Sequence, residues 1–282
     1  MLFRSIRWPD EPLAQEARLF QYKWPAVMAY LRANRLNHDV IRGPQDRLGL
    51  MASGKAYNDT RQALMDLGLD EHRCNQLGIR LHKVGVVWPL EEHSLRDFAN
   101  GLQHIMVVEE KRGVIEPQVK ELLYHWPESQ RPQVSGKWAG PEMQGAYLLR
   151  PNHELNPGLI ARAIALRLRQ MGIDADTEAA IAARLALLDA KERSLQTQHV
   201  QADRLPWFCS GCPHNTSTKV PEGSRAMAGI GCHFMSLWMD RSTAGFTQMG
   251  GEGAPWVGQQ AFSNDQHIFA NIGDGTYFHS GL

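Results

Sequence analysis

Short apolar runs in the middle of the chain alternate with segments in which apolar residues recur at helical spacing. The runs cover residues 48–52, 79–87 and 105–108, and each predicts a buried strand. Residues 55–67 and 115–124 carry apolar side chains three and four positions apart, which predicts helices. Strands that alternate with helices favour a parallel sheet, so this part of the chain is expected to have an α/β fold.

The segments before the first run and between the second and third runs predict helices and a link. Residues 11–35 predict one helix, because apolar residues recur three and four positions apart, and Pro25 is expected to kink or break it. Residues 37–44 predict a turn-rich link. Further along, Ser94 is the expected N-cap of a helix over residues 95–102.

A linker and a pair of helices are predicted to follow. Residues 127–156 are rich in Pro, Gly and Gln, which is typical of a linker. Asn156 and Pro157 predict the N-cap and first position of a helix. With a second helix over residues 177–190, this segment is expected to form an αα-hairpin between two α/β domains.

Composition excludes some classes of protein. The 282 residues carry 30 Lys and Arg against 30 Asp and Glu, so no basic field indicates nucleic-acid binding. No apolar run approaches the roughly 20 residues that span a bilayer, so no membrane partner is expected. The first residues lack the apolar core of a signal peptide. Few, clustered cysteines fit a reducing compartment, and the cytoplasm is the expected location.

Three of the four cysteines are candidate metal ligands. Cys209 and Cys212 form a C-x-x-C motif, and Cys232 follows at a distance. A four-cysteine zinc ribbon requires a second C-x-x-C motif, but Met235 occupies the position of its last cysteine. A dithiol and a [4Fe–4S] cluster with a fourth thiolate from elsewhere are the other possibilities. Cys74 is expected to be a buried apolar residue.

An apolar run near the end of the sequence leads into Gly273-Asp274-Gly275. The run, residues 268–272, predicts a buried parallel strand. Ligands of doubly wound sheets lie at the carboxyl ends of strands, where an acid can hold Mg²⁺ and through it a diphosphate. A plain turn is the competing interpretation. In the glycine-rich loop before it, Glu252 is expected to order the loop.

Two charged features are expected to have no binding role. Residues 109–112, Glu-Glu-Lys-Arg, are interpreted as solvated charge at a strand end. Lys55 could meet a phosphate at a helix N-terminus, but a solvent-facing lysine is the favoured interpretation.

The longest motifs resemble one enzyme family. The last quarter of the sequence resembles the thiamine-diphosphate domain of indolepyruvate ferredoxin oxidoreductases, which are 2-oxoacid:ferredoxin oxidoreductases. An earlier part is similar to the domain of these enzymes that resembles the transketolase C-terminal domain. The motifs of the first kind are FCSGCPHNTST (208–218), AGIGCHFM (228–235), QMGGEGAPW (248–256) and NIGDGTYFHSGL (271–282); those of the second are MASGKAYNDTRQAL (51–64), LHKVGVVWPLE (81–91) and VVEEKRGVIEPQVKELLYHW (107–126).

The resemblance implies an α/β fold class with four parts. The expected parts are a helical lead-in (1–45), a transketolase-C-terminal-like parallel-sheet domain (46–140), a linker with a helical hairpin (141–204), and the start of a thiamine-diphosphate-binding α/β domain (205–282). The motif that opens with Gly-Asp-Gly would close beyond residue 282. The chain is therefore expected to be an internal fragment of the enzyme, inactive alone.

The resemblance also implies cofactors and partners. The cofactors are thiamine diphosphate, Mg²⁺ and a [4Fe–4S] cluster. The partners are a 2-oxoacid such as indolepyruvate, CoA, ferredoxin and the remaining domains or subunits of a homo-oligomeric enzyme. No catalytic residue is assigned. The residues expected near thiamine diphosphate are His214, Cys232, Gly273, Asp274, Gly275 and Thr276, and the expected metal ligands are Cys209, Cys212, Cys232 and Asp274.

Overall fold

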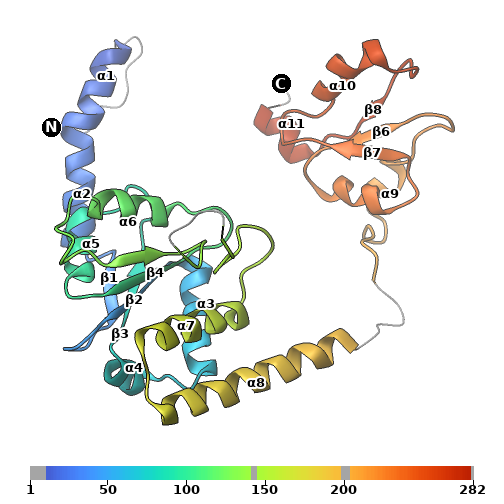
Figure 1. Cartoon of the computed structure of the whole chain (residues 1–282). Coiled ribbons are helices and arrows are strands. Elements are labelled where there is room, and N and C mark those ends of the chain that lie inside the picture. Colours follow the sequence, from blue (N-terminus) through green and yellow to red (C-terminus); the bar gives the residue numbers. More distant parts are fainter. Residues whose placement is uncertain (1–10, 141–144, 198–203, 281–282) are drawn as a thin grey trace. The chain divides into compact units, whose positions relative to one another are not determined.

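A computed structural model describes residues 11–140, 145–197 and 204–280. The chain divides into two compact units, Met1–Thr197 and Gln198–Leu282, each considered by itself (Figure 1). Expectations for residues 1–10, for part of the linker and for the last two residues lie outside the described residues. None of the described helices is both long and apolar enough to cross a bilayer.

The first unit contains a five-stranded sheet in the order β1-β3-β2-β4-β5. Strands β2 to β5 are parallel, and β1 pairs with β3 in the antiparallel direction. This confirms the predicted α/β fold class and its three apolar strands. The strands are β1 (His38–Ile41), β2 (Leu48–Ser53), β3 (Ile79–Val84), β4 (His104–Val108) and β5 (Gln133–Ser135).

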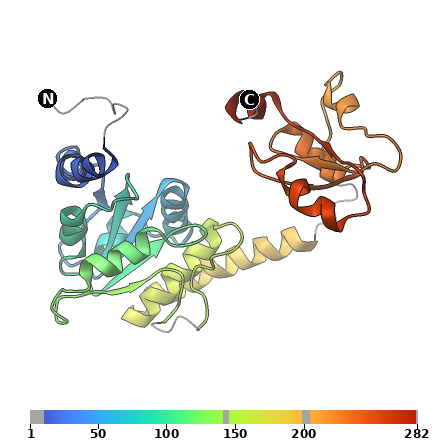
Figure 2. The same cartoon turned by 90° about the horizontal axis from the view of Figure 1, so that it is seen from above.

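Helices cover both faces of this sheet (Figures 1 and 2). One core packs β2, β3 and β4 against α3 (Gly54–Asp66), α4 (Glu71–Leu77) and α7 (Pro157–Met171). The other packs the opposite face against α5 (Glu92–Ala99) and α6 (Ile115–Leu123). The central strands are buried on both sides, which explains why they are continuous apolar runs.

Two strands lie where the sequence predicted none. β1 lies in the predicted turn-rich link, and β5 lies in the predicted linker, where Leu149 and Leu155 also join a core. Both strands are at the sheet edges, and each is short and partly polar. The predicted cap is also wrong. Glu91, not Ser94, caps α5, and its carboxylate accepts hydrogen bonds from the backbone of His93 and Ser94.

The predicted helix over residues 11–35 consists of three helical segments. These are α1 (Pro12–Arg18), a π-helical segment η1 (Leu19–Lys23) and α2 (Trp24–Ala33). Pro25 lies in the first turn of α2, directly after the π-helical segment, so the helical path changes its hydrogen-bond pattern beside this proline. Within these segments only Leu31 is buried, and Leu13 is 69% exposed.

The helical pair after the linker is confirmed. The Asn156 side chain accepts a hydrogen bond from the Leu159 N–H at 2.9 Å, so it caps α7 as predicted. Helix α8 (Ala175–Thr197) packs beside α7. Arg162 of α7 forms ion pairs with Asp189 and Glu192 of α8. The four-part domain division as a whole stays a prediction.

The charged cluster after β4 is only partly solvated. Glu109 is 9% exposed, and its carboxylate accepts the backbone N–H groups of Val114, Ile115 and Glu116 at the start of α6. The expectation of solvated charge was therefore wrong for Glu109, because the carboxylate satisfies donors that the helix leaves unpaired. Cys74 is fully buried, as predicted. Lys55 binds Asp59 and the Leu155 carbonyl.

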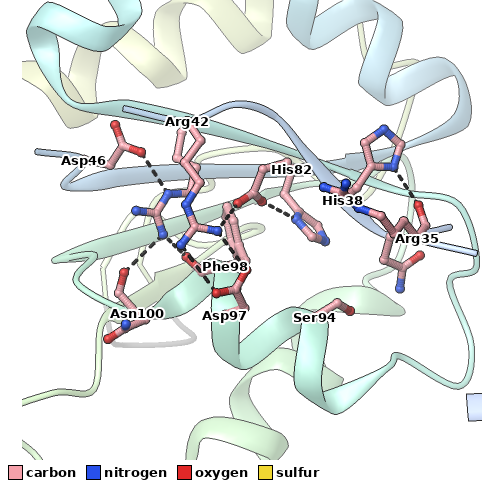
Figure 3. Close-up of polar contacts among 12 residues, drawn as sticks. Arg35, His38, Arg42, Asp46, His82, Ser94, Asp97, Phe98 and Asn100 are labelled. Carbon is pink, nitrogen blue, oxygen red and sulfur yellow. Dashed lines mark hydrogen bonds and ion pairs between the residues drawn. The ribbon is translucent and has the colours of Figure 1, made fainter. Parts of the chain in front are cut away.

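Polar side chains from β3 lie between the sheet and α5 (Figure 3). Arg80 donates to the buried carboxylate of Asp46 at 2.9 Å, and it also donates to the Phe98 carbonyl. His82 contacts Asp39 at 2.6 Å and lies against the Phe98 ring. The second core therefore encloses a buried ion pair.

The second unit contains a small parallel sheet in the order β7-β6-β8. The predicted strand over residues 268–272 forms only β8 (Phe269–Ala270), and the expectation that it is buried is wrong, since Phe269 is 39% exposed. It lies at the end of the small sheet, with β6 as its one neighbouring strand there. The other elements are α9 (His214–Ser217), β6 (Ala226–Ala228), η2 (Cys232–Trp238), β7 (Thr243–Phe246), α10 (Ala254–Gln259), η3 (Gln260–Phe262) and α11 (Asp274–Ser280).

Candidate functional site

Three loops leave the small sheet at one edge. Because β6, β7 and β8 are parallel, the segments 229–231, 247–253 and 271–273 all begin at the carboxyl ends of strands. Ligands of parallel α/β sheets bind at such edges. This carboxyl edge, defined by the three loops, is the candidate site.

Asp274 begins α11 at this edge. Its carboxylate is exposed and accepts the N–H of Gly275 at 2.8 Å. No atom within 4 Å would oppose a side chain at Gly275, so the space beside the acid is open. A carboxylate with one oxygen free and open surroundings is suited to a hard cation.

Glu252 connects two of the loops. Its carboxylate accepts the N–H of Gly250 at 2.7 Å and the hydroxyl of Thr276, which is 2% exposed, at 2.9 Å. Its side chain fills the space over Gly229, where a Cβ atom would collide with it. Burial opposes ionisation, but backbone hydrogen bonds and Thr276 lower the pKa of Glu252. The predicted loop-ordering role of Glu252 is confirmed.

Replacing Glu252 with alanine should loosen the loop that follows β7. A hydrogen bond to a charged acceptor contributes about 1.5–3 kcal/mol, so we expect amide exchange around Gly250 to accelerate about tenfold or more. Hydrogen–deuterium exchange measured by mass spectrometry checks this on the 247–253 segment. Glu222→Ala, a change at an exposed acid of another loop, should leave that segment unchanged. Equal protection in the Glu252 variant would contradict the role.

His233 lies where the loops meet, and it is 1% exposed. Its Nε2 accepts the N–H of Gly229 at 3.1 Å. Burial, followed by the neighbouring His214, lowers the pKa of His233, while Glu252 acts in the opposite direction. The ring is therefore neutral near pH 7. A Cβ placed on Gly273 would lie 3.4 Å from the ring, so the Gly-Asp-Gly turn packs directly on His233.

An aromatic stack joins the cysteine loop to this edge. His214 stacks on Phe208 at 5.5 Å and on His233 at 5.9 Å between ring centroids. The Cys212 sulfur lies 3.2 Å from His214 Nδ1. The structure thus brings His214 and Cys212 to the vicinity of Gly273, as a shared site would need.

The three candidate cysteines are separate thiols in this structure. Cys209 and Cys232 are exposed, and Cys212 is partly buried. Within residues 11–140, 145–197 and 204–280, no three His, Cys, Asp or Glu side chains are grouped closely enough to hold a metal ion. The C-x-x-C loop and Cys232 therefore do not form a ligand set, for zinc or for an iron–sulfur cluster, among these residues.

Sequence reasoning missed two polar residues of the edge. His233 and Asn271 enter the sequence analysis only as members of the motifs at residues 228–235 and 271–282. His233 lies five residues after β6 and Asn271 directly follows β8, and this placement after parallel strands is the signal that could have found them.

Comparison with known proteins decides the family. The family model described as the indolepyruvate ferredoxin oxidoreductase middle domain matches residues 37–198. The chain belongs to this family. The matched region comprises the five-stranded sheet of the first unit and both helices after it. The resemblance seen in the sequence motifs is confirmed.

Several curated relatives carry the name indolepyruvate oxidoreductase subunit IorA. The protein from Pyrococcus horikoshii is 26% identical over 86% of this chain and 36% of its own length. The relative from Methanothermobacter marburgensis is 25% identical over 96% of this chain and 40% of its own length. The relative from Archaeoglobus fulgidus is 26% identical over 99% and 42%. The chain thus spans well under half the length of these relatives.

Two solved structures are similar over about half of the chain. One is a 2-oxoglutarate:ferredoxin oxidoreductase from Magnetococcus marinus, with 12% identity, a TM-score of 0.39, and coverage of 56% of this chain and 24% of that one. The other is a split-gene transketolase, with 17% identity, a TM-score of 0.31, and coverage of 54% and 42%.

Proposed function

We propose that this chain is part of a thiamine-diphosphate-dependent oxidoreductase that decarboxylates indolepyruvate or another arylpyruvate and passes electrons to ferredoxin. The observation that supports this proposal is the carboxyl edge of the small sheet. There the exposed Asp274 lies between two glycines, and the hydroxyl of Thr276 is hydrogen-bonded to Glu252. The family membership and the names of the curated relatives support the oxidoreductase role.

The residues at the edge fit the diphosphate end of the cofactor. Asp274 would hold Mg²⁺, because its carboxylate is exposed and the space beside Gly275 is open. Gly273 and Gly275 would let the backbone approach the phosphates, and Thr276 is held in place by Glu252. When bound, thiamine diphosphate supplies the carbanion for decarboxylation of the 2-oxoacid.

The proposed [4Fe–4S] cluster fits the described residues less well. A cubane cluster takes four thiolates, whereas Cys209, Cys212 and Cys232 are not grouped, and the buried Cys74 belongs to the first unit. No electron-transfer step is therefore assigned to these three thiols. Assembly of a cluster would need the cysteine loop to close on Cys232 and a fourth ligand to be supplied.

The proposed partners come from the same family. They are the 2-oxoacid, CoA, ferredoxin and the remaining domains or subunits of a homo-oligomeric enzyme, since the relatives are named as subunits and are longer than this chain. The proposed compartment is the cytoplasm, on the basis of the free thiols.

The 3.2 Å contact between Cys212 and His214 favours one alternative, a thiol–disulfide or metal-binding module without thiamine. Anaerobic purification followed by iron, sulfide, zinc and thiol analysis separates these cases. Iron with sulfide supports the cluster. Zinc alone, or a Cys209–Cys212 disulfide without metal, supports the alternative.

Replacement of Asp274 with asparagine tests the proposed function. We expect the whole chain to bind thiamine diphosphate only with Mg²⁺, and the variant to lose at least about tenfold in affinity, because a neutral amide is a weaker ligand for a hard cation. Isothermal titration calorimetry with and without Mg²⁺ measures the effect.

The matched control is Asp240→Asn, at an exposed acid between η2 and β7 that lies outside the three loops. It should bind like the wild type. The proposal fails if the wild-type chain does not bind the cofactor, or if the Asp274 variant binds it equally well with Mg²⁺.

A further inference from the structure

The buried ring of His233 has a hydrogen-bond donor without a partner among the described residues. The Gly229 N–H can only donate, so Nε2 of His233 must carry the lone pair that accepts it. In the neutral ring the proton is then on Nδ1. Among the described residues, Nδ1 is buried and has no hydrogen-bond partner. An unpaired buried N–H is destabilising, so this one indicates an acceptor that joins the site.

Two glycines of the carboxyl edge lie beside this donor. A Cβ atom on Gly231 would lie 3.2 Å from Nδ1, and one on Gly273 would lie 3.8 Å from it. Gly231 is exposed and has a φ of 137°, a conformation that L side chains rarely adopt. A side chain at either position would crowd the imidazole, so both glycines keep the space beside Nδ1 free of side-chain atoms.

A second unused donor belongs to the same edge. The side-chain nitrogen of Asn271, at the start of the loop after β8, is buried and also has no partner in the described part of the chain. The carboxylate of Glu252, on the loop after β7, already accepts from Gly250 and Thr276. The edge therefore offers two free donors, and its binding partner should be rich in acceptor oxygens, as a diphosphate is.

We propose that His233 is a diphosphate-binding residue that donates its Nδ1 proton to a phosphate oxygen between Gly231 and Gly273, with Asn271 as a second donor. This assignment rests on the proposed function, because the diphosphate is that of the cofactor. It adds a neutral donor to a site in which the carboxylate of Asp274 would hold the cation. The stacked His214 ring fixes the imidazole plane, so a change in the cysteine loop would be transmitted to this donor.

Two substitutions separate the two ring nitrogens. His233→Asn keeps an N–H near the position of Nδ1, whereas His233→Gln keeps an acceptor near Nε2 for the Gly229 N–H. His267→Asn is the matched control, since His267 is exposed and precedes β8 at the amino end of the sheet. Calorimetric titrations of the full chain use thiamine diphosphate, inorganic pyrophosphate and unphosphorylated thiamine, all with Mg²⁺. The ¹⁵N resonance of His233 Nδ1 provides a readout that does not depend on affinity.

We expect pyrophosphate to shift that resonance, and His233→Gln to raise the dissociation constants of both diphosphates by about tenfold to a hundredfold. The dissociation constants of His233→Asn and His267→Asn should stay within about threefold of the wild-type values. This change is smaller than the one expected from losing a hydrogen bond to a charged group. A Gln variant that binds like the wild type, or an Asn variant that loses as much as the Gln variant while folded by circular dichroism, overturns the inference and leaves the proposed function intact.

The outcomes for the wild-type chain separate the two proposals further. Binding of pyrophosphate that depends on His233, without binding of thiamine diphosphate, keeps the donor assignment and overturns the thiamine function. Binding of neither diphosphate overturns both.

Discussion

Replacing Asp46 with alanine is expected to lower the free energy of unfolding of the first unit by about 3–5 kcal/mol. The Asp46 side chain is 0% exposed and pairs with Arg80, which is 6% exposed. Without the carboxylate, a guanidinium would remain buried, and among the described residues the carbonyls of Phe98 and Asn100 would be its hydrogen-bond partners (Figure 3). Asp46 also accepts the N–H of Gly43 at 2.9 Å, so one more donor would lose its acceptor.

Urea denaturation followed by far-ultraviolet circular dichroism measures this loss. The matched control is Asp97→Asn, which weakens the exposed pair with Arg42 in the same region. Exposed ion pairs contribute about 0–1 kcal/mol, so the control should change stability by no more than that. The double variant Asp46→Ala/Arg80→Met should be more stable than Asp46→Ala alone, because the unpaired charge is gone. Equal stability of the Asp46 variant and the control would contradict this account.

Lowering the pH from 6.5 to 4 is expected to remove roughly 3 kcal/mol of stability through His104. Burial, followed by the charge of Arg167, lowers the pKa of His104 from 6.5 to about 4. The unfolded chain therefore binds a proton in this range that the folded chain does not. The stabilisation is complete above pH 6.5 and is lost as the pH falls toward 4. Each pH unit corresponds to about 1.4 kcal/mol.

The His104→Asn variant isolates this contribution from that of the carboxyl groups. Its free energy of unfolding, measured by urea denaturation at several pH values, should fall less steeply than that of the wild type between pH 6.5 and 4. His93→Asn, at an exposed position, should keep the wild-type slope. His104 hydrogen-bonds to Ser135 at 2.7 Å, so its variant also loses some stability at all pH values, and only the slope is diagnostic. Identical slopes for wild type and variant would refute the assignment.

The sequence predicted the centre of the first sheet well and its edges poorly. Strands β2 and β4 are apolar on both sides because helices cover both faces of the sheet, so they appear in the sequence as uninterrupted apolar runs. β1 carries His38 and Asp39, and Asp39 contacts His82 from an edge strand. Such a polar segment has no local signal for a strand, because its pairing with β3 depends on a partner some forty positions away.

The sequence predicted where the candidate site lies in the chain, but it did not predict the contacts within the site. Gly273-Asp274-Gly275 indicated the end of a strand, and the structure has Asp274 directly after the loop that follows β8. The contacts of Glu252 and His233 depend on how three loops converge, which no local spacing encodes. His233 in particular looked like a neighbour of a metal ligand, whereas its ring stacks on His214 and lies against Gly273.

The end position of β8 in the small sheet has a consequence for handling the second unit. One side of this strand pairs with β6, and the other is the terminal edge of the described sheet. Phe269 on β8 and Phe278 on α11 add exposed apolar surface, 39% and 78% accessible. An open edge of this kind is a template for pairing with strands of other molecules. Residues 204–280 produced alone should therefore self-associate through backbone pairing unless another polypeptide segment occupies that edge.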